Sequence, residues 1–110
     1  MGVSGNLFSL PETLPEEEVF EDLLPVSPVR IERIISTGQV TPDGIWLRQE
    51  MDEWVVLLQG QAALEYEDGR RSELDRGDWI LIPAYTRHRV VLTSSSPPCV
   101  WLAVHGKLLE

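Results

Sequence analysis

One glutamate and one histidine stand where strand-like patterning turns an ionisable side chain inward. Glu53 and His88 each begin an alternating run, and Arg87 and Arg89 occupy the opposite parity around the histidine. Successive side chains of a strand point to opposite faces, and arginines rarely face a core. The apolar residues that share a face with them are Val55 and Leu57 for Glu53, and Val90 and Leu92 for His88. We therefore expect an inward carboxylate and an inward imidazole.

Burying such groups costs free energy unless something compensates. A bound metal, a hydrogen-bonded pair or a water-filled cavity would each do so. His105, the only other imidazole, shares parity with Trp101 and Ala103. It could face the same interior as His88 and supply a further ligand, or it could cap the exposed end of the final strand.

Short strands are the elements that must position these residues. Runs rich in β-branched and apolar residues alternate with Gly, Pro and Asp, and Asp68-Gly69 is a two-residue hairpin signal. No segment after residue 28 has a helical period, so an all-β sandwich or barrel is expected. The predicted strands include 29–37, 45–49, 53–59, 62–67, 79–82, 87–93 and 100–105.

The N-terminal segment has a different pattern. Thr13 and Glu16 have the spacing of a capping box, and an apolar i, i+3, i+4 stripe follows at Phe20, Leu23 and Leu24. These features predict a short helix over 13–24, ended by Pro25 and Pro28. Its acidic side chains are interpreted as a solvated face rather than a docking surface. We expect an acidic extension over 1–28 and a barrel domain over 29–110.

Composition narrows the range of functions. The chain has 110 residues and a formal charge of −9, which argues against a nucleic-acid partner. A single cysteine, Cys99, excludes an internal disulfide. No apolar run has a membrane-spanning length, and no secretory signal is evident. The expectation is a cytoplasmic protein with no membrane partner.

The spacing of two segments resembles the cupins, a family of small β-barrels. The second cupin motif is written G-x5-P-x-G-x2-H-x3-N, and Gly77, Pro83 and His88 match its first, second and fourth positions. The first is written G-x5-H-x-H-x3,4-E-x6-G, and Glu53 and Gly60 match its last two positions. The resemblance covers roughly residues 29–105. It implies a jelly-roll barrel that often forms homodimers.

The sequence departs from these motifs at the positions that bind metal. Cupins typically hold a divalent metal with three histidines and one glutamate, and Leu47 and Gln49 stand where two of those histidines belong. Elsewhere, Tyr85 replaces the glycine of the second motif, Leu92 replaces its asparagine, and Thr41 replaces the first glycine of the first motif.

Three functions follow from the residues and the resemblance together. In a metal-dependent enzyme, Gln49, Glu53 and His88 would bind zinc, iron, manganese or nickel, with His105 as a fourth ligand. In a metal-free isomerase or lyase, His88 and Glu53 would transfer protons, with Tyr85 assisting. In a non-catalytic barrel, the same pocket would only bind a small molecule. All three place the site at Glu53 and His88.

Overall fold

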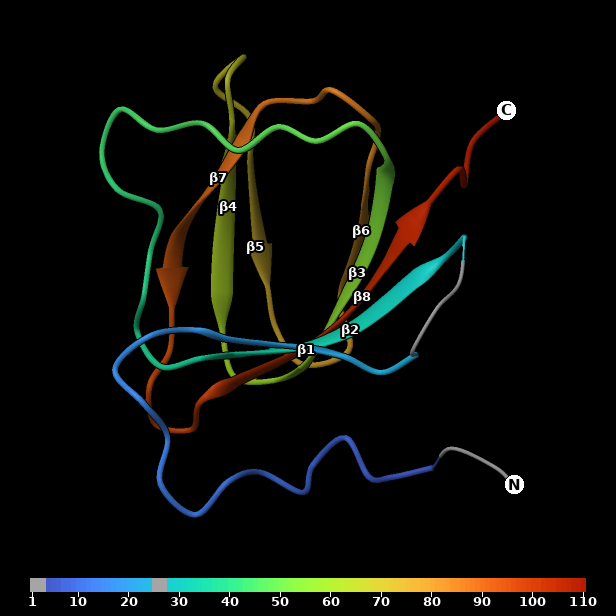
Figure 1. Ribbon diagram of the computed structural model, residues 1–110. Helices are drawn as coiled ribbons and strands as arrows, with labels where there is room; N and C mark the ends of the chain where they lie inside the picture. The colour runs from blue at the N-terminus through green and yellow to red at the C-terminus, as the bar shows by residue number, and fades with distance from the viewer. Residues whose placement is uncertain (1–3, 25–27) are drawn as a thin grey trace.

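The computed structural model describes residues 4–24 and 28–110, and these form two antiparallel sheets. The larger sheet has the strand order β1-β2-β8-β3-β6 and the smaller one has the order β5-β4-β7. Figure 1 shows the smaller sheet facing the part of the larger sheet that contains β3 and β6. The strands are β1 (Val19–Asp22), β2 (Arg30–Ser36), β3 (Asp52–Gln59), β4 (Ala62–Tyr66), β5 (Arg71–Leu74), β6 (Trp79–Ile82), β7 (His88–Thr93) and β8 (Cys99–Gly106).

The core lies between the two sheets, as strand parity predicts. Leu57 and Ala103 are completely buried, and Trp101 is 4% exposed. Trp54 and Trp79 take the opposite parity on β3 and β6, and their rings lie 5.9 Å apart. Of these tryptophans, only Trp101 therefore belongs to the barrel interior. The all-β barrel expected from the sequence is confirmed.

The glycine that ends the first motif is required by a close approach. Gly60 has a φ of +94°, and a Cβ at this position would lie 2.7 Å from Ser94 Oγ and 3.0 Å from the Cys99 Cα. Only glycine tolerates both conditions without a shift of the backbone. The turn between β3 and β4 can thus pack directly against the start of β8.

The helix predicted over 13–24 is wrong. The described part of this segment contains β1, which pairs antiparallel with β2 from Val19↔Ile35 to Asp22↔Glu32. An isolated helix of this length is marginal in water, whereas the edge of β2 offers a complete ladder of hydrogen bonds. Of the two prolines expected to end the helix, Pro25 lies outside the described residues.

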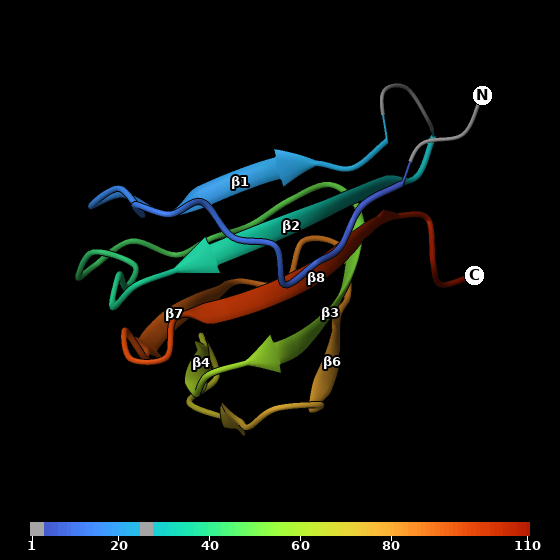
Figure 2. The same cartoon turned by 90° about the horizontal axis from the view of Figure 1, so that it is seen from below.

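Two acids of this segment, Glu21 and Asp22, pair with arginines of β2, whereas Glu16 and Glu17 are exposed. Arg33 donates to Glu21 Oε1 at 2.7 and 2.9 Å, and Arg30 Nε donates to Asp22 Oδ1 at 2.7 Å. Residues 4–14 then run past the outer side of β2 (Figure 2), where Arg33 Nη1 donates to the carbonyls of Leu7 and Ser9. The extension is thus fastened to the barrel.

A second expectation, a strand over 45–49, is also wrong. The segment is a loop that touches β7 through one isolated bridge, Leu47↔His88, with backbone hydrogen bonds of 2.7 and 3.0 Å. Ile45 is 51% exposed and Leu47 is 41% exposed, so no buried apolar face holds the segment along β7.

Asp52 fastens the C-terminal tail to the barrel. Its Oδ1 accepts a hydrogen bond from Ala84 N at 2.8 Å, and its Oδ2 accepts from Leu108 N at 2.9 Å and Leu109 N at 3.0 Å. These three hydrogen bonds from backbone N–H groups hold the pKa of the Asp52 carboxyl below its ordinary value of 3.8, and the bond from Ala84 has the largest effect.

We expect Asp52→Asn to lower Tm by a few degrees at neutral pH, because its amide nitrogen would face backbone N–H donors. A carboxyl with a lowered folded pKa stabilises the fold above its unfolded pKa, and this stabilisation is lost as the pH falls through the folded pKa. Thermal unfolding should therefore show the two proteins converging in acid. Asp43→Asn, at an exposed site, is the control. A difference that persists at low pH would contradict this account.

Candidate functional site

A cavity of about 290 Å³ lies in the barrel interior, next to the β2, β3 and β8 strands. One part of its lining is apolar and is supplied by both sheets. The apolar side chains include Ile34, Val55, Leu64, Ile82, Val90 and Trp101. The polar side chains include Glu18, Glu32, Arg48, Gln49, Glu53, His88 and His105. A concave apolar surface with a few convergent polar groups is typical of a small-molecule site.

The centre of the polar lining is an imidazole between two carboxylates. His105 Nε2 lies 2.8 Å from Glu32 Oε1 and 3.9 Å from Glu53 Oε2. The sheet register produces this arrangement, because β8 runs between β2 and β3 and pairs His105 directly with Glu53. His105 and Glu32 are 7% and 4% exposed. The structure thus places His105 inside the barrel rather than at a solvated strand end.

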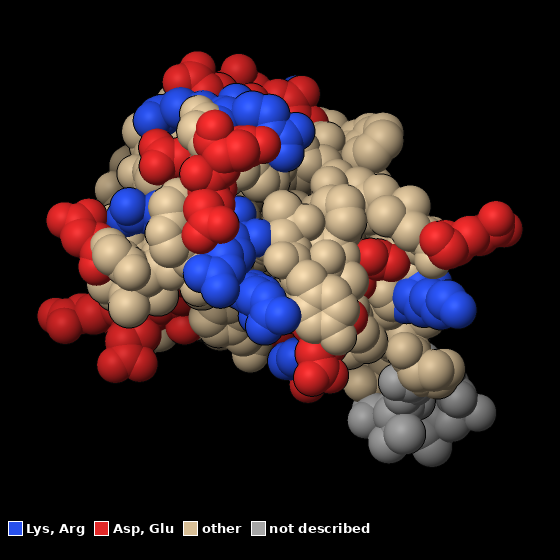
Figure 3. All heavy atoms as spheres, turned by 90° about the horizontal axis from the view of Figure 1, so that it is seen from above, with Lys and Arg blue, Asp and Glu red and all other residues tan. Residues whose placement is uncertain are grey.

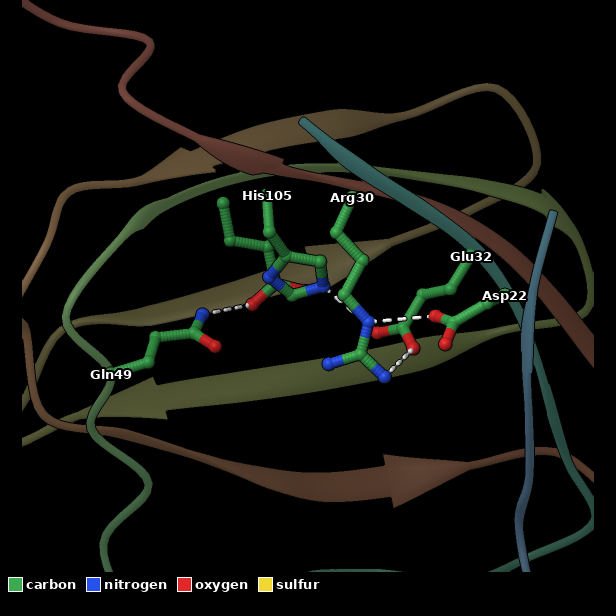
Figure 4. Close-up of polar contacts among 6 residues, drawn as sticks. Asp22, Arg30, Glu32, Gln49 and His105 are labelled. Carbon is green, nitrogen blue, oxygen red and sulfur yellow. Dashed lines mark hydrogen bonds and ion pairs between the residues drawn. The ribbon is translucent and has the colours of Figure 1, made fainter. Parts of the chain in front are cut away.

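Gln49 and Arg30 each hold one of the two carboxylates, and Figure 4 shows these two side chains on opposite sides of the His105 ring. Gln49 Nε2 donates to Glu53 Oε1 at 2.6 Å from the loop before β3. Arg30 Nη2 lies 3.3 Å from Glu32 Oε2, and Asp22 in turn holds Arg30. Both carboxylates therefore have fixed orientations before any ligand enters.

These contacts favour the protonated form of His105. The hydrogen bond with Glu32 is the largest cause, and the charge of Glu53 adds to it. Burial acts in the opposite direction, but the pKa of His105 is raised above its ordinary value of 6.5. The ring can thus carry a proton close to neutral pH.

His88 lies in the same cavity lining but takes no part in this cluster. Its Nδ1 lies 2.9 Å from the Thr86 carbonyl oxygen, which can only accept, so Nδ1 is the donor. In the neutral ring the lone pair is then on Nε2, which has no hydrogen-bond partner among the described residues. The structure brings His88 and Glu53 to one cavity without a hydrogen bond between them.

Tyr85, the third residue considered for catalysis, lies outside the cavity lining among the residues described. It is 54% exposed, and the Arg48 guanidinium lies 4.8 Å from the centre of its ring. Its φ of 64° shows that the backbone keeps the left-handed conformation for which the cupin motif uses glycine. Tyr85 thus reaches the cavity lining through the Arg48 guanidinium and through its backbone N–H, which donates to the Gln49 carbonyl oxygen at 2.8 Å.

Two carboxylates of the site were missed by the sequence reasoning. Glu32 shares parity with Ile34 and Ser36, so strand alternation alone could have placed it inward. Glu18 had no such signal, because it fell in the predicted helix. It accepts a hydrogen bond from Ser36 Oγ at 2.5 Å, and Ser36 Oγ accepts from Trp101 Nε1 at 3.1 Å.

The surface near the 45–49 loop carries charges of both signs. Figure 3 shows this end of the molecule, with basic and acidic side chains interspersed and no broad basic surface. The described part of the chain contains no helix long and apolar enough to cross a membrane.

Comparison with known proteins gives one family and many solved structures. The family model described as "Cupin domain" matches residues 34–105. A Ralstonia eutropha protein described as a "putative mannose-6-phosphate isomerase" has 42% identity and a TM-score of 0.88, over 94% of this chain and 97% of that chain. A cupin superfamily protein of Desulfitobacterium hafniense has 18% identity and a TM-score of 0.73, over 90% and 85%. No protein of curated function matches.

The pairing with Glu32 should be visible in the titration of His105. We expect Glu32→Gln to lower the pKa of His105, because the largest cause of the raised value is removed while burial remains. An NMR titration of the ring signals measures this, with the two histidines distinguished through His88→Gln. Glu50→Gln, at an exposed position, is the control.

The same variant should change the pH dependence of stability. A raised folded pKa contributes stability that is fully present below the unfolded pKa, near 6.5, and is lost as the pH rises through the folded value. This loss should be absent in Glu32→Gln. An unchanged His105 titration would mean that the Glu32 contact does not control the ring.

Proposed function

The chain belongs to the cupin family, and within that family we propose that it binds a small molecule in the barrel and transfers protons without a metal ion. The observation that carries this proposal is the His105 imidazole, hydrogen bonded to Glu32 and facing Glu53 at the wall of the cavity. An oriented imidazole with a carboxylate partner is a general acid–base pair. The reaction class that fits is an isomerisation or an elimination.

The proposal gives the polar residues separate roles. His105, whose proton is stabilised by Glu32, is the acid, with Glu53 holding it from the other side. His88 is the base, because its Nε2 faces no protein donor while Nδ1 is occupied by Thr86. Tyr85 is a rim residue that positions Arg48.

The metal that the family resemblance implies does not fit the donor set. Leu47 has no side-chain donor atom, and the Gln49 amide nitrogen donates to Glu53, which leaves one neutral amide oxygen as a possible ligand. Within the described residues, no three His, Cys, Asp or Glu side chains are grouped to hold a metal ion. A metal bound by Gln49, Glu53, His88 and His105 would also compete with the hydrogen bonds that Glu53 and His105 Nε2 already make with Gln49 and Glu32. The proposed proton transfer therefore uses side chains alone.

Sugar-phosphate isomerisation is the activity named for the Ralstonia relative, and it is the most direct alternative. A phosphate needs cationic or backbone N–H donors. Arg48 is the single Lys or Arg side chain in the described lining, which also contains three carboxylates. This charge balance favours a substrate without phosphate.

A non-catalytic ligand-binding barrel is the second candidate function. It is favoured by the fact that Glu53 and His105 already have fixed protein partners, as a static buried pair would. Such a barrel would bind the same ligand without turnover, which the following experiment distinguishes.

The test is solvent deuterium exchange catalysed by chelator-treated protein. We expect 1H NMR to show exchange at carbons next to the carbonyl in a panel of small cationic, neutral and anionic carbonyl compounds. His105→Gln and His88→Gln should each slow it by about 10²–10⁴-fold, the usual contribution of a positioned acid or base. Glu50→Gln is the control. Exchange that requires an added divalent metal would overturn the proposal, and saturable binding without exchange would favour the non-catalytic barrel.

Restoring the two missing motif histidines should create a metal site. The double variant Leu47→His, Gln49→His restores the two histidines of the cupin motif beside Glu53 and His88, so we expect it to retain about one equivalent of zinc or manganese after dialysis. The natural chain should retain far less under the same conditions. Elemental analysis of untagged protein measures both. Stoichiometric metal in the natural chain would contradict the account of its donor set.

A further inference from the structure

The polar lining of the cavity contains more acceptors than donors. Three carboxylates line it, against one arginine. Gln49 Nε2 is used on Glu53, and His105 Nε2 is used on Glu32. A ligand that enters this space therefore meets three carboxylates against two cationic side chains of the described lining, Arg48 and a protonated His105. The carboxylates are Glu18, Glu32 and Glu53.

One of these acceptors, on Glu32, is deeply buried. Glu32 is 4% exposed, and its Oε2 accepts no hydrogen bond; among the described residues its polar contact is the ion pair with Arg30 at 3.3 Å. A buried acceptor without a hydrogen bond costs free energy, so a ligand with N–H groups that reached Glu32 Oε2 would relieve this cost.

The rest of the lining is hydrocarbon and aromatic. Aliphatic side chains from both sheets and the Trp101 indole form it, with Phe20 of β1 at its edge. Phe20 is 57% exposed, so it lies where the cavity meets solvent. This surface suits a compact hydrocarbon, and the aromatic faces attract positive charge.

We infer that the ligand is a small amphiphilic cation, a primary ammonium on a compact hydrocarbon body. The inference rests on the proposed function and names the substrate class of that same site. The ammonium donates to Glu32 and is neutralised by the carboxylates, which leaves His88 Nε2 available as the base, while the hydrocarbon lies against Trp101. Glu18 and Glu32 are the specificity-determining residues. An anion would meet three like charges, and a neutral alcohol would leave them unbalanced.

Charge-matched probes of one shape test this inference on the natural protein. Cyclohexylammonium, cyclohexanol and cyclohexanecarboxylate differ in charge and not in ring size. Binding is followed by NMR through the Trp101 indole N–H, which is assigned with Trp101→Phe. We expect saturable binding of the ammonium, at least tenfold weaker binding of the alcohol and none of the carboxylate.

Variants then assign the selectivity to single residues. Glu32→Gln should weaken ammonium binding about tenfold and leave the alcohol unchanged. Glu18→Gln should act in the same direction, and it serves as the second variant if Glu32→Gln does not fold. Glu50→Gln, which lies outside the cavity, should have no effect. The inference is overturned if the carboxylate or the alcohol binds as tightly as the ammonium, or if the ammonium does not bind.

Failure of this inference is distinguishable from failure of the proposed function. Metal-independent exchange on an anionic or neutral substrate would leave the proton-transfer proposal intact and remove the cationic ligand class. Selective ammonium binding without any exchange would do the reverse.

Discussion

The burial of charge at the junction of β2, β8 and β3 is the constraint on which the site depends. Removing a carboxylate from water costs several kcal/mol even after relaxation. Glu32 and Glu53 are both largely removed, and His105 is shared between them. The cost is offset only while the three strands keep their register, because a one-residue slip would turn every one of these side chains to the opposite face. The chemistry of the cavity therefore depends directly on the strand register of the larger sheet.

The N-terminal segment also helps to position the charged side chains of the cavity. β1 lies along β2, where Asp22 holds Arg30 against Glu32, so the segment orients the cluster from outside. It also supplies Glu18 and Phe20 to the cavity. Part of the net charge of −9 therefore comes from carboxylates that line the cavity, and the rest comes from acidic side chains elsewhere in the chain.

Most of the correct predictions from the sequence came from the alternation of side chains along strands. It placed Glu53 and His88 inward and located the barrel, because a period of two is a local property that burial enforces. It could not place β1, whose acids and apolar stripe satisfy helical spacing equally well, since its conformation is decided by pairing with the free edge of β2, the next strand in the chain. Nor could it pair His105 with Glu32, because that contact depends on which strands become neighbours.

The exchange of two motif histidines for Leu47 and Gln49 has a consequence for charge balance. A divalent cation bound by the cupin motif would neutralise the carboxylate at position 53. Here the Gln49 amide supplies only a dipole to Glu53. Among the described residues, the cationic group that lies close to Glu53 is His105, and His105 is also hydrogen bonded to Glu32. Within the described lining, three carboxylates then stand against two cationic side chains, Arg48 and His105, while Arg30 pairs with Glu32 from outside the lining. Since the fold keeps this deficit instead of removing a carboxylate, the missing positive charge is best supplied by what binds there.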